Sequence, residues 1–291
     1  MKKVLVLGGT RFFGKRLVHK LISKGYEVSI ATRGITEDNL GEKVNRITID
    51  RKNPETLKKL SNENWDLVYD NICYTPNEAK EIIKIVTNHV KKYIFTSSLA
   101  VYNDGLNHVE KDFDPFNYPI DYKENDEFSY AEGKRLSEAV LFQEATFPVV
   151  AARFPIVLGA DDYTKRLLFH VHKITHNEEM IISDLNKEMT FIDSDETAEF
   201  LLWLGENESI ISGPYNACSN GSITFKEIIG ICEKEIGKKA IILTEGPKEN
   251  QSPFDAYSDQ SLSNEKAKTE GFQFLEVHNW MKNLIKQYSS L

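Results

Sequence analysis

A tyrosine and a lysine four residues apart form the first pair in this sequence that could do chemistry. Tyr130 is the only one of the 12 tyrosines with a lysine at this spacing, Lys134. On a helix, residues i and i+4 share one face, so an ammonium at this position favours the ionised phenol. Tyr130 would then serve as an acid or base near neutral pH. Such a pair also arises by chance at this lysine content, so the prediction depends on its surroundings.

Ser98 is the third residue of the predicted catalytic set. It ends the fifth predicted strand, at the carboxyl edge of the sheet where a cofactor would lie. A serine hydroxyl there can hold a substrate carbonyl or hydroxyl group. The alternative interpretation is that Tyr130 is a core tyrosine, Lys134 an exposed lysine and Ser98 a capping serine.

A glycine-rich turn near the start of the chain predicts a dinucleotide site. It follows a short apolar run at residues 4–7 and precedes a helical pattern, so its glycines would let a pyrophosphate approach the backbone. The alternative is a tight turn without a ligand. The cofactor-binding residues predicted in this turn are Gly8, Gly9, Thr10, Arg11, Phe12, Phe13 and Gly14.

The end of the second predicted strand favours NADP over NAD. An NAD site usually carries an acidic residue at this point, whereas this chain has Arg33, whose planar guanidinium suits a 2′-phosphate. Arg11 could reach the same phosphate. Asp50 and Arg51, which end the third strand, would lie near the adenine. The alternative is that Arg33 is a solvated cation of the loop.

Alternating strand and helix patterns predict the fold class, an α/β protein with a Rossmann-type, doubly wound parallel sheet. The residues between 32 and 43 are too few and too rich in glycine for a full helix. Residues 103–125 predict a long loop, and long loops in compact domains are often functional. Predicted strands are 4–7, 27–31, 44–49, 67–69, 93–95, 149–154, 181–182, 215–217 and 240–243; predicted helices are 13–24, 53–60, 77–89, 127–146, 165–176, 196–204, 225–236 and 276–287.

Composition limits the remaining classes. The 291 residues suffice for one large domain or two medium ones, and the net charge of −8 disfavours a nucleic-acid partner. Cys73, Cys218 and Cys232 are widely spaced, which predicts small buried residues in a reducing cytosol. No apolar stretch is long enough for a membrane helix or a signal peptide, so we expect a cytoplasmic protein.

The chain resembles the extended and atypical short-chain dehydrogenase/reductases, the NAD(P)-dependent epimerase/dehydratase family. Residues 8–14 are similar to its glycine turn, residues 96–102 to its serine segment and residues 130–134 to its Tyr-x-x-x-Lys. Residues 153–159, 191–195 and 215–217 look like its later segments. The resemblance implies a Rossmann domain at 1–158 and 190–218, with a smaller, partly interleaved substrate domain at 159–189 and 219–291. It also implies that Ser98 orients the substrate, Tyr130 transfers a proton and Lys134 binds the ribose.

The chain departs from this family at three positions, and two of them bear on the substrate. Arg11 stands where members usually have glycine, and the turn is most similar to the branch that includes chloroplast stem-loop-binding proteins. Ile156 and Met189 stand where sugar-nucleotide enzymes often have the asparagine and arginine that contact the diphosphate. The substrate is therefore left as a small molecule with a carbonyl or hydroxyl group, with sugars and sugar nucleotides included.

Other polar clusters predict no further chemistry. His170, His172 and His176 diverge too far on one helix to bind a metal together, so no metal is expected. The acidic residues of the long loop predict a solvated lid surface: Glu110, Asp112, Asp114, Asp121, Glu124, Asp126 and Glu127. We expect an NADP-dependent oxidoreductase or epimerase, compatible with a homodimer; the alternative is a non-catalytic dinucleotide sensor or an RNA-associated scaffold.

Overall fold

The computed structural model describes residues 1–123 and 127–290. The chain divides into two compact units, a first one of residues 1–103, 110–154 and 197–217, and a second one of residues 104–109, 155–196 and 218–291. Each unit is thus assembled from three separate stretches of chain. That the second unit binds the substrate stays a prediction.

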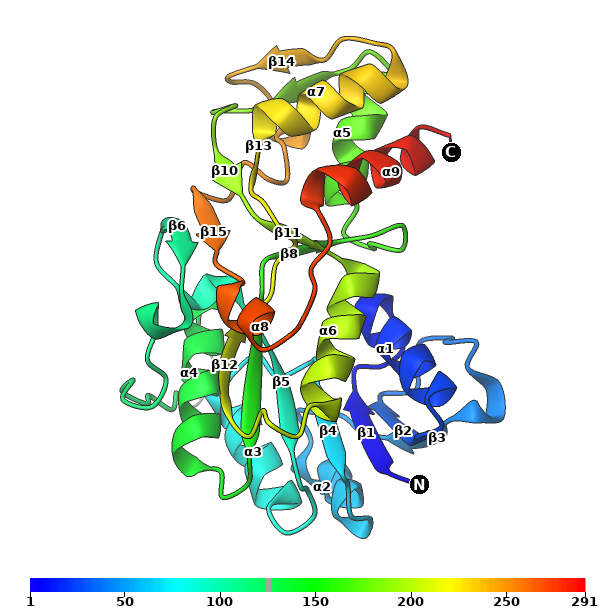
Figure 1. The fold of residues 1–291 in the computed structure, drawn as a ribbon, viewed down its shortest axis with the longest axis vertical. Coiled ribbons are helices and arrows are strands. Elements are labelled where there is room, and N and C mark those ends of the chain that lie inside the picture. The colour runs from blue at the N-terminus through cyan, green and yellow to red at the C-terminus, as the bar shows by residue number, and fades with distance from the viewer. Residues whose placement is uncertain (124–126, 291) are drawn as a thin grey trace. The chain divides into compact units, whose positions relative to one another are not determined.

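The first unit contains a seven-stranded parallel sheet, in the order β12-β7-β5-β4-β1-β2-β3 (Figure 1). The inner strand β1 is apolar, as expected for a strand covered on both faces, and Val4, Leu5, Val6 and Leu7 are fully buried. This architecture confirms the predicted Rossmann-type fold class. The strands are β1 (Lys3–Leu7), β2 (Glu27–Thr32), β3 (Asn45–Thr48), β4 (Leu67–Asp70), β5 (Tyr93–Ser98), β7 (Val149–Phe154) and β12 (Gly213–Asn216).

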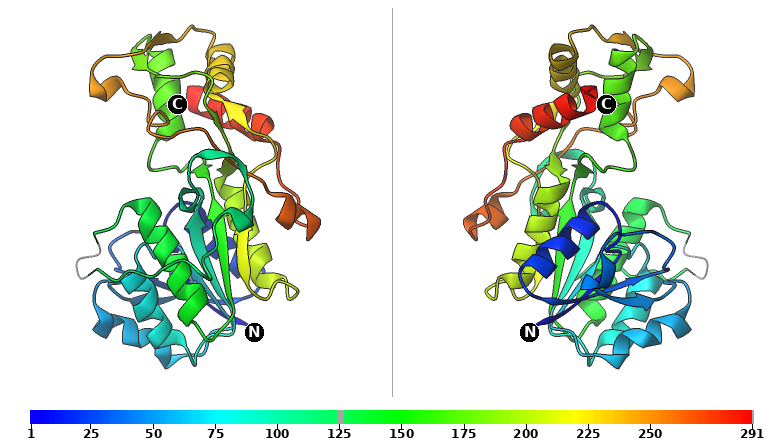
Figure 2. Two further views of the ribbon diagram at one scale, coloured as in Figure 1. Left: turned by 90° about the vertical axis from the view of Figure 1, so that its left-hand side faces the viewer. Right: turned by 90° about the vertical axis from the view of Figure 1, so that its right-hand side faces the viewer.

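Helices cover both faces of this sheet, with α1 and α6 on one side and α3 and α4 on the other (Figures 1 and 2). Between β2 and β3 there is only a short 3₁₀ turn, η1 (Gly41–Lys43), as the glycine content predicted. The helical elements are α1 (Phe12–Ser23), α2 (Pro54–Leu57), η2 (Lys58–Asn62), α3 (Pro76–Val86), η3 (Leu99–Val101), η4 (Glu110–Asp112), α4 (Tyr130–Glu144) and α6 (Ser194–Glu206), the first three residues of which belong to the second unit.

Two sequence predictions in this region are wrong in detail. The stretch predicted as a long loop contains β6 (Gly105–His108), which pairs with a strand from the far C-terminal part of the chain, a partner that local sequence cannot reveal. The helix predicted from residue 127 begins at Tyr130, because the Ser129 hydroxyl accepts a hydrogen bond from Glu132 N at 3.2 Å and caps it.

The second unit combines small sheets with three longer helices. Its apolar core gathers Phe191, Phe225, Phe254 and Met281 from four segments. All three cysteines of the chain are buried free thiols, as predicted. The elements are β8 (Ile156–Leu158), α5 (Arg166–Thr175), β9 (Glu179–Ile181), β10 (Glu188–Met189), β11 (Phe191–Asp193), β13 (Ile223–Thr224), α7 (Phe225–Ile236), β14 (Ile241–Leu243), η5 (Lys248–Asn250), β15 (Gln260–Leu262), α8 (Glu265–Thr269) and α9 (Val277–Ser289).

Candidate active site

In the turn between β1 and α1, two glycine positions are packed so closely that they leave no room for a side chain. A Cβ atom on Gly8, where φ is +84°, would lie 2.5 Å from Ile72 Cγ2, and one on Gly14 would lie 2.3 Å from the Gly8 carbonyl oxygen. The residue preceding α1, Arg11, makes no side-chain cap to the first N–H groups. A bare backbone at a helix N-terminus is the surface that a pyrophosphate requires, so these residues fit a dinucleotide.

Two exposed arginines lie in the turns after β1 and after β2. The side chains of Arg11 and Arg33 form no hydrogen bond or ion pair with the part of the chain that the structure describes. Asp38 could have supplied the acid of an NAD site, but it is buried and accepts a hydrogen bond from Arg46 Nη2 at 2.8 Å. That hydrogen bond keeps the pKa of Asp38 below its ordinary value.

The guanidinium of Arg51 is used inside the protein. Its Nη1 atom lies 2.6 Å from Asp70 Oδ2, and its Nε atom lies 3.8 Å from Glu78 Oε2. Asp50 is exposed and accepts a hydrogen bond from Lys52 N at 3.0 Å. Contact of Asp50 or Arg51 with an adenine therefore stays a prediction, and this arrangement leaves Asp50 the more accessible of the two.

The three predicted catalytic residues lie in the first unit, at the end of β5 and within the first two turns of α4. Tyr130 is the first residue of α4 and is 56% exposed, whereas Lys134, one turn later, is 2% exposed. The Lys134 ammonium lies 5.9 Å from the centre of the Tyr130 ring. Ser98 ends β5, and its hydroxyl accepts a hydrogen bond from Ala100 N at 3.1 Å. Tyr130 and Lys134 thus share one helix face, as their spacing predicted.

Backbone oxygens hold Lys134 in place. Its Nζ atom donates hydrogen bonds to the carbonyl oxygens of Cys73, at 2.7 Å, and of Thr96, at 2.8 Å. An ammonium has three N–H donors, so one remains without a partner among the described residues. Cys73 and Thr96 belong to the segments after β4 and in β5, so the lysine ties α4 to two neighbouring strands.

Sequence reasoning missed Tyr74. Its ring centre lies 4.5 Å from Lys134 Nζ, and the buried ring of Phe95 lies 4.8 Å away on another side. The Tyr74 side chain is 46% exposed and packs near Tyr130, with ring centres 6.3 Å apart. The available signal was its position: Tyr74 follows β4 at the same carboxyl edge as Ser98.

A buried ion pair lies next to the predicted catalytic residues in the chain. Glu138 follows Lys134 by four residues on α4 and pairs with Arg153 of β7 at 2.6 Å, both side chains being fully buried. Glu138 also accepts a hydrogen bond from Ser97, the neighbour of Ser98. Arg153 Nη1 donates to the Tyr102 hydroxyl at 2.8 Å. This network connects α4, β5, β7 and the segment that follows Ser98.

The histidines of α5 do not converge. His170 is fully buried, with Nε2 2.7 Å from the Ser252 hydroxyl, and burial lowers its pKa to about 4. His172 and His176 stack on the exposed side of the helix with ring centres 4.1 Å apart. Within residues 1–123 and 127–290, no three histidine, cysteine or acidic side chains are arranged to bind a metal ion. The absence of a metal stays a prediction.

The acidic side chains between positions 110 and 127 differ in their exposure to solvent. Glu110 is half-buried and accepts a hydrogen bond from Asn216 N at 2.8 Å, so it has a structural contact. The exposed members are Asp112, Asp114, Asp121 and Glu127. Glu124 and Asp126 lie outside the described residues, and a lid role for this surface stays a prediction.

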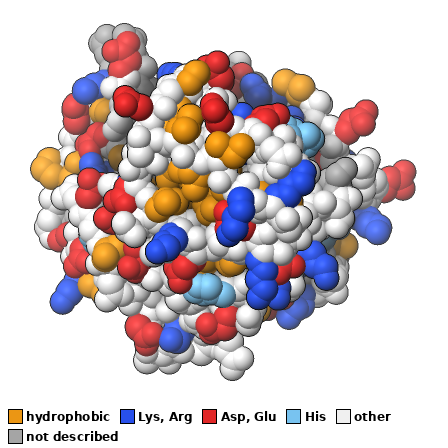
Figure 3. All heavy atoms as spheres, turned by 90° about the horizontal axis from the view of Figure 1, so that it is seen from above, with side chains coloured by type: hydrophobic (Ala, Val, Ile, Leu, Met, Phe, Trp, Pro, Cys, Tyr) orange, Lys and Arg blue, Asp and Glu red, His pale blue; other side chains and the backbone are white. Residues whose placement is uncertain are grey.

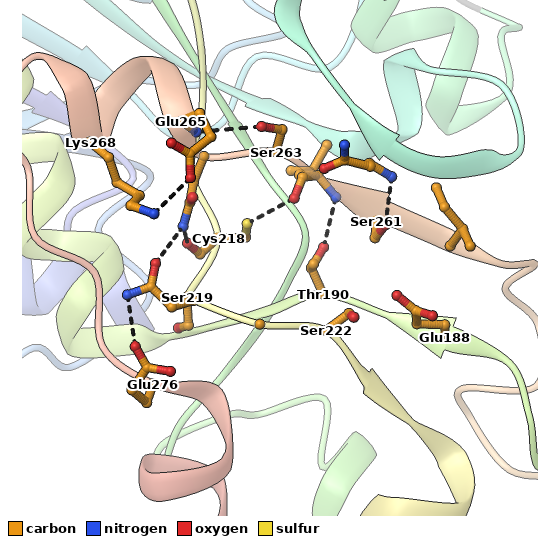
Figure 4. Close-up of a pocket in the computed structure, with 16 residues that line it drawn as sticks. Glu188, Thr190, Cys218, Ser219, Ser222, Ser261, Ser263, Glu265, Lys268 and Glu276 are labelled. Carbon is orange, nitrogen blue, oxygen red and sulfur yellow. Dashed lines mark hydrogen bonds and ion pairs between the residues drawn. The ribbon is translucent and has the colours of Figure 1, made fainter.

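The second unit has a polar pocket of about 530 Å³ that sequence reasoning did not predict (Figure 4). Its wall includes the buried side chains of Thr190, Ser219 and Ser261. Three carboxylates line it against one ammonium, Lys268, which pairs with Glu265 at 2.7 Å. This excess of negative charge disfavours a phosphate group in the pocket.

A known protein family and two plant proteins are similar to this chain in sequence. Residues 4–218 match the sequence model of the NAD dependent epimerase/dehydratase family. The chloroplast stem-loop binding protein of 41 kDa b of Arabidopsis thaliana is 35% identical over 127 residues, which cover 38% of this chain and 33% of that protein. UDP-glucuronic acid decarboxylase 1 of the same plant is 24% identical over 266 residues, which cover 82% of this chain and 60% of that protein. The chain therefore spans less than two thirds of either relative.

Solved structures share the fold over nearly the whole chain. A dTDP-glucose 4,6-dehydratase from Bacillus anthracis, in complex with NAD, gives a TM-score of 0.78 at 14% identity and covers 100% of this chain and 97% of its own. A UDP-glucuronic acid 4-epimerase from Bacillus cereus, in complex with UDP-glucuronic acid and NAD, gives 0.76 at 19% identity and covers 99% of both chains. At these identities the likeness concerns the fold.

Proposed function

This chain belongs to the NAD dependent epimerase/dehydratase family, and we propose that it uses a nicotinamide dinucleotide to transform a carbonyl or hydroxyl group of a small substrate. The family match confirms the predicted family and the predicted enzyme class. The reaction itself and its residues are the proposal. Tyr130 would transfer the proton, Lys134 would bind the cofactor ribose and assist Tyr130, and Ser98 would orient the substrate oxygen.

The position of Lys134 carries this proposal. Burying an ammonium is costly unless its donors are satisfied, and here two of three are bound to backbone oxygens. The third N–H is left for a ribose hydroxyl. Tyr130, one turn away and more than half exposed, keeps its phenol accessible to a substrate. A bound nicotinamide would supply the hydride acceptor or donor, and the glycine turn would hold the pyrophosphate.

Substitution of Tyr130 by phenylalanine tests the proton transfer. Tyr130→Phe removes one oxygen, so we expect unchanged cofactor affinity and turnover lower by about 10²–10⁴-fold, as for a lost acid or base. The measurement is steady-state turnover on any substrate found in a panel of aldehydes, ketones, sugars and sugar nucleotides. Wild-type rates in Tyr130→Phe would exclude this mechanism, and tight cofactor binding with no turnover on the panel would favour a sensor.

We also propose that the cofactor is NADP. Arg33 and Arg11 are cations without a protein partner among the described residues, and the nearby acid, Asp38, is already bound to Arg46. Arg33→Ala should weaken NADP binding by about 1.5–3 kcal/mol, the value of a charged hydrogen bond, and leave NAD binding unchanged. Calorimetric titration of both cofactors measures this, and tighter NAD binding by the wild type would exclude the preference.

The substrate class rests on two apolar side chains. Ile156 and Met189 are 9% and 3% exposed and belong to the apolar core of the second unit. Neither side chain can donate a hydrogen bond to a diphosphate. The substrate panel should therefore contain simple sugars and carbonyl compounds as well as sugar nucleotides. The similar dehydratase and epimerase structures make sugar nucleotides a necessary part of that panel.

The relative that binds stem-loops gives a second candidate function, RNA association. The net charge of −8 disfavours it, and the face shown in Figure 3 carries both acidic and basic side chains around an apolar area rather than a field of one sign. Electrophoretic mobility of a stem-loop RNA at low and moderate salt tests this function.

Among the described residues, no helix is both long and apolar enough to cross a membrane. A homodimer and a cytoplasmic location stay predictions.

A further inference from the structure

Lys134 is surrounded by aromatic rings, and one of them is exposed enough to be replaced without opening the core. The ring centres of Tyr74 and Phe95 lie 4.5 Å and 4.8 Å from Nζ. A cation at this distance from a ring face is attracted by the ring quadrupole. Phe95 is fully buried inside β5, whereas Tyr74 is 46% exposed. Tyr74 is therefore the ring that can be tested.

The backbone of Tyr74 is fixed from two sides. Its N–H donates a hydrogen bond to Glu78 Oε2 at 2.7 Å, and Thr75, the next residue, caps α3 with its hydroxyl. On the other side, a Cβ atom at Gly133 would lie only 2.3 Å from the Tyr74 carbonyl oxygen. The glycine inside the Tyr-x-x-Gly-Lys segment thus permits the contact that brings Tyr74 to the helix face of Lys134.

We propose that Tyr74 is a positioning residue for Lys134: its ring closes the solvent-facing side of the ammonium and keeps the third N–H directed to the cofactor. The ring, and not its hydroxyl, performs this role, because the contact with Nζ is made to the ring face. No acidic side chain neutralises Lys134 among the described contacts, so the aromatic face stabilises the charge without removing it. The proposal rests on the proposed dinucleotide function.

Two substitutions separate the ring from the hydroxyl. Tyr74→Leu removes the aromatic face, and Tyr74→Phe keeps it. Tyr122→Leu is the matched control, because the Tyr122 ring also lies 4.0 Å from a lysine, Lys80, on another part of the first unit. We expect Tyr74→Leu to weaken binding of the reduced cofactor by about threefold to tenfold. Tyr74→Phe and Tyr122→Leu should bind like the wild type.

A second readout does not depend on the cofactor. Limited acetylation with acetic anhydride, followed by peptide mass spectrometry, measures how accessible Lys134 is. In the wild type, in Tyr74→Phe and in Tyr122→Leu, Lys134 should be protected, and in Tyr74→Leu it should react several times faster. Cofactor affinity is measured on the same samples by fluorescence titration with NADPH and NADH.

Each result decides between roles. Equal binding and equal acetylation in Tyr74→Leu and wild type would overturn the proposal. The same losses in Tyr74→Phe would assign the effect to the hydroxyl and overturn it as well. Weaker binding without faster acetylation would mean that Tyr74 contacts the cofactor directly. If the wild type binds neither NADPH nor NADH, the proposed function fails, while the acetylation rates still test the contact between Tyr74 and Lys134.

Discussion

Lys134 of α4 and Arg153 of β7, which pairs with Glu138 of α4, are both buried cations, yet their surroundings differ. Arg153 meets the carboxylate of Glu138 at 2.6 Å, so the charge of each is cancelled by the other. Lys134 contacts two carbonyl oxygens and two aromatic faces, and no carboxylate among the described residues pairs with it. We therefore expect the paired Arg153 to stabilise the fold, and the Lys134 ammonium, which contacts carbonyl oxygens and rings, to bind a ligand.

The largest effect is expected where a charge is left unpaired. Arg153→Met would bury the Glu138 carboxylate without a partner and should lower the free energy of unfolding by about 3–5 kcal/mol. Urea denaturation followed by circular dichroism measures this loss. The double variant Glu138→Gln with Arg153→Met removes both charges and should recover much of it. A loss below about 1 kcal/mol in the single variant would contradict the assigned role of the pair.

Glu196 extends the comparison to a buried carboxyl group for which the described part of the chain supplies no cationic partner. It is 5% exposed in the second unit and accepts hydrogen bonds from the Ser219 hydroxyl and Leu275 N, and burial raises its pKa to about 7. The folded state therefore binds this proton more tightly than the unfolded state. Its contribution to stability is complete below about pH 4.5, falls as the pH rises to about 7 and stays low above that.

Glu196→Gln should remove this pH dependence. We expect the free energy of unfolding of the variant to rise relative to wild type by about 1–3 kcal/mol between pH 4.5 and pH 8. The difference between the two proteins is measured by urea denaturation at each pH, which cancels the opposite contribution of His170. A constant difference across this range would show that folding does not raise the pKa of Glu196.

The smallest effect on stability is expected at Lys134. Lys134→Met leaves the carbonyl groups of Cys73 and Thr96 without a donor, which should cost about 1–2 kcal/mol, but it leaves no opposite charge unpaired. Cofactor affinity should also fall in Lys134→Met. Arg153→Met, in contrast, is not expected to affect cofactor affinity directly. Urea denaturation and cofactor titration give both values. A stability loss equal to that of Arg153→Met would remove the distinction between the two cations.

Much of the first unit could be predicted because its signals are local. The apolar run at residues 4–7, the glycine turn and the i, i+4 spacing of Tyr130 and Lys134 each lie within a few residues. The strand β6 could not be predicted in this way, because it is stabilised by β15, more than 150 residues away in the chain. The same applies to the partners of Arg51, whose guanidinium pairs with Asp70 and Glu78.

The sequence predicted which residues form the candidate site, but it did not predict the contacts that hold their side chains in place. The sequence indicated that Lys134 faces Tyr130, but its two carbonyl acceptors have no side-chain signature. Tyr74 was missed for a related reason: its backbone lies against Gly133, which is distant along the chain, although its hydrogen bond to Glu78 is local.

No α-helix connects β2 and β3, and this affects how the edge of the large sheet is protected. β3 is the last strand in the order, and three of its four residues, Asn45, Arg46 and Thr48, are exposed. An open strand edge is a template on which another chain can add a strand and begin aggregation. Because β3 is short and its exposed side chains are polar or charged, such pairing is unfavourable. The length and side chains of β3 therefore protect this sheet edge, next to which no helix connects β2 and β3.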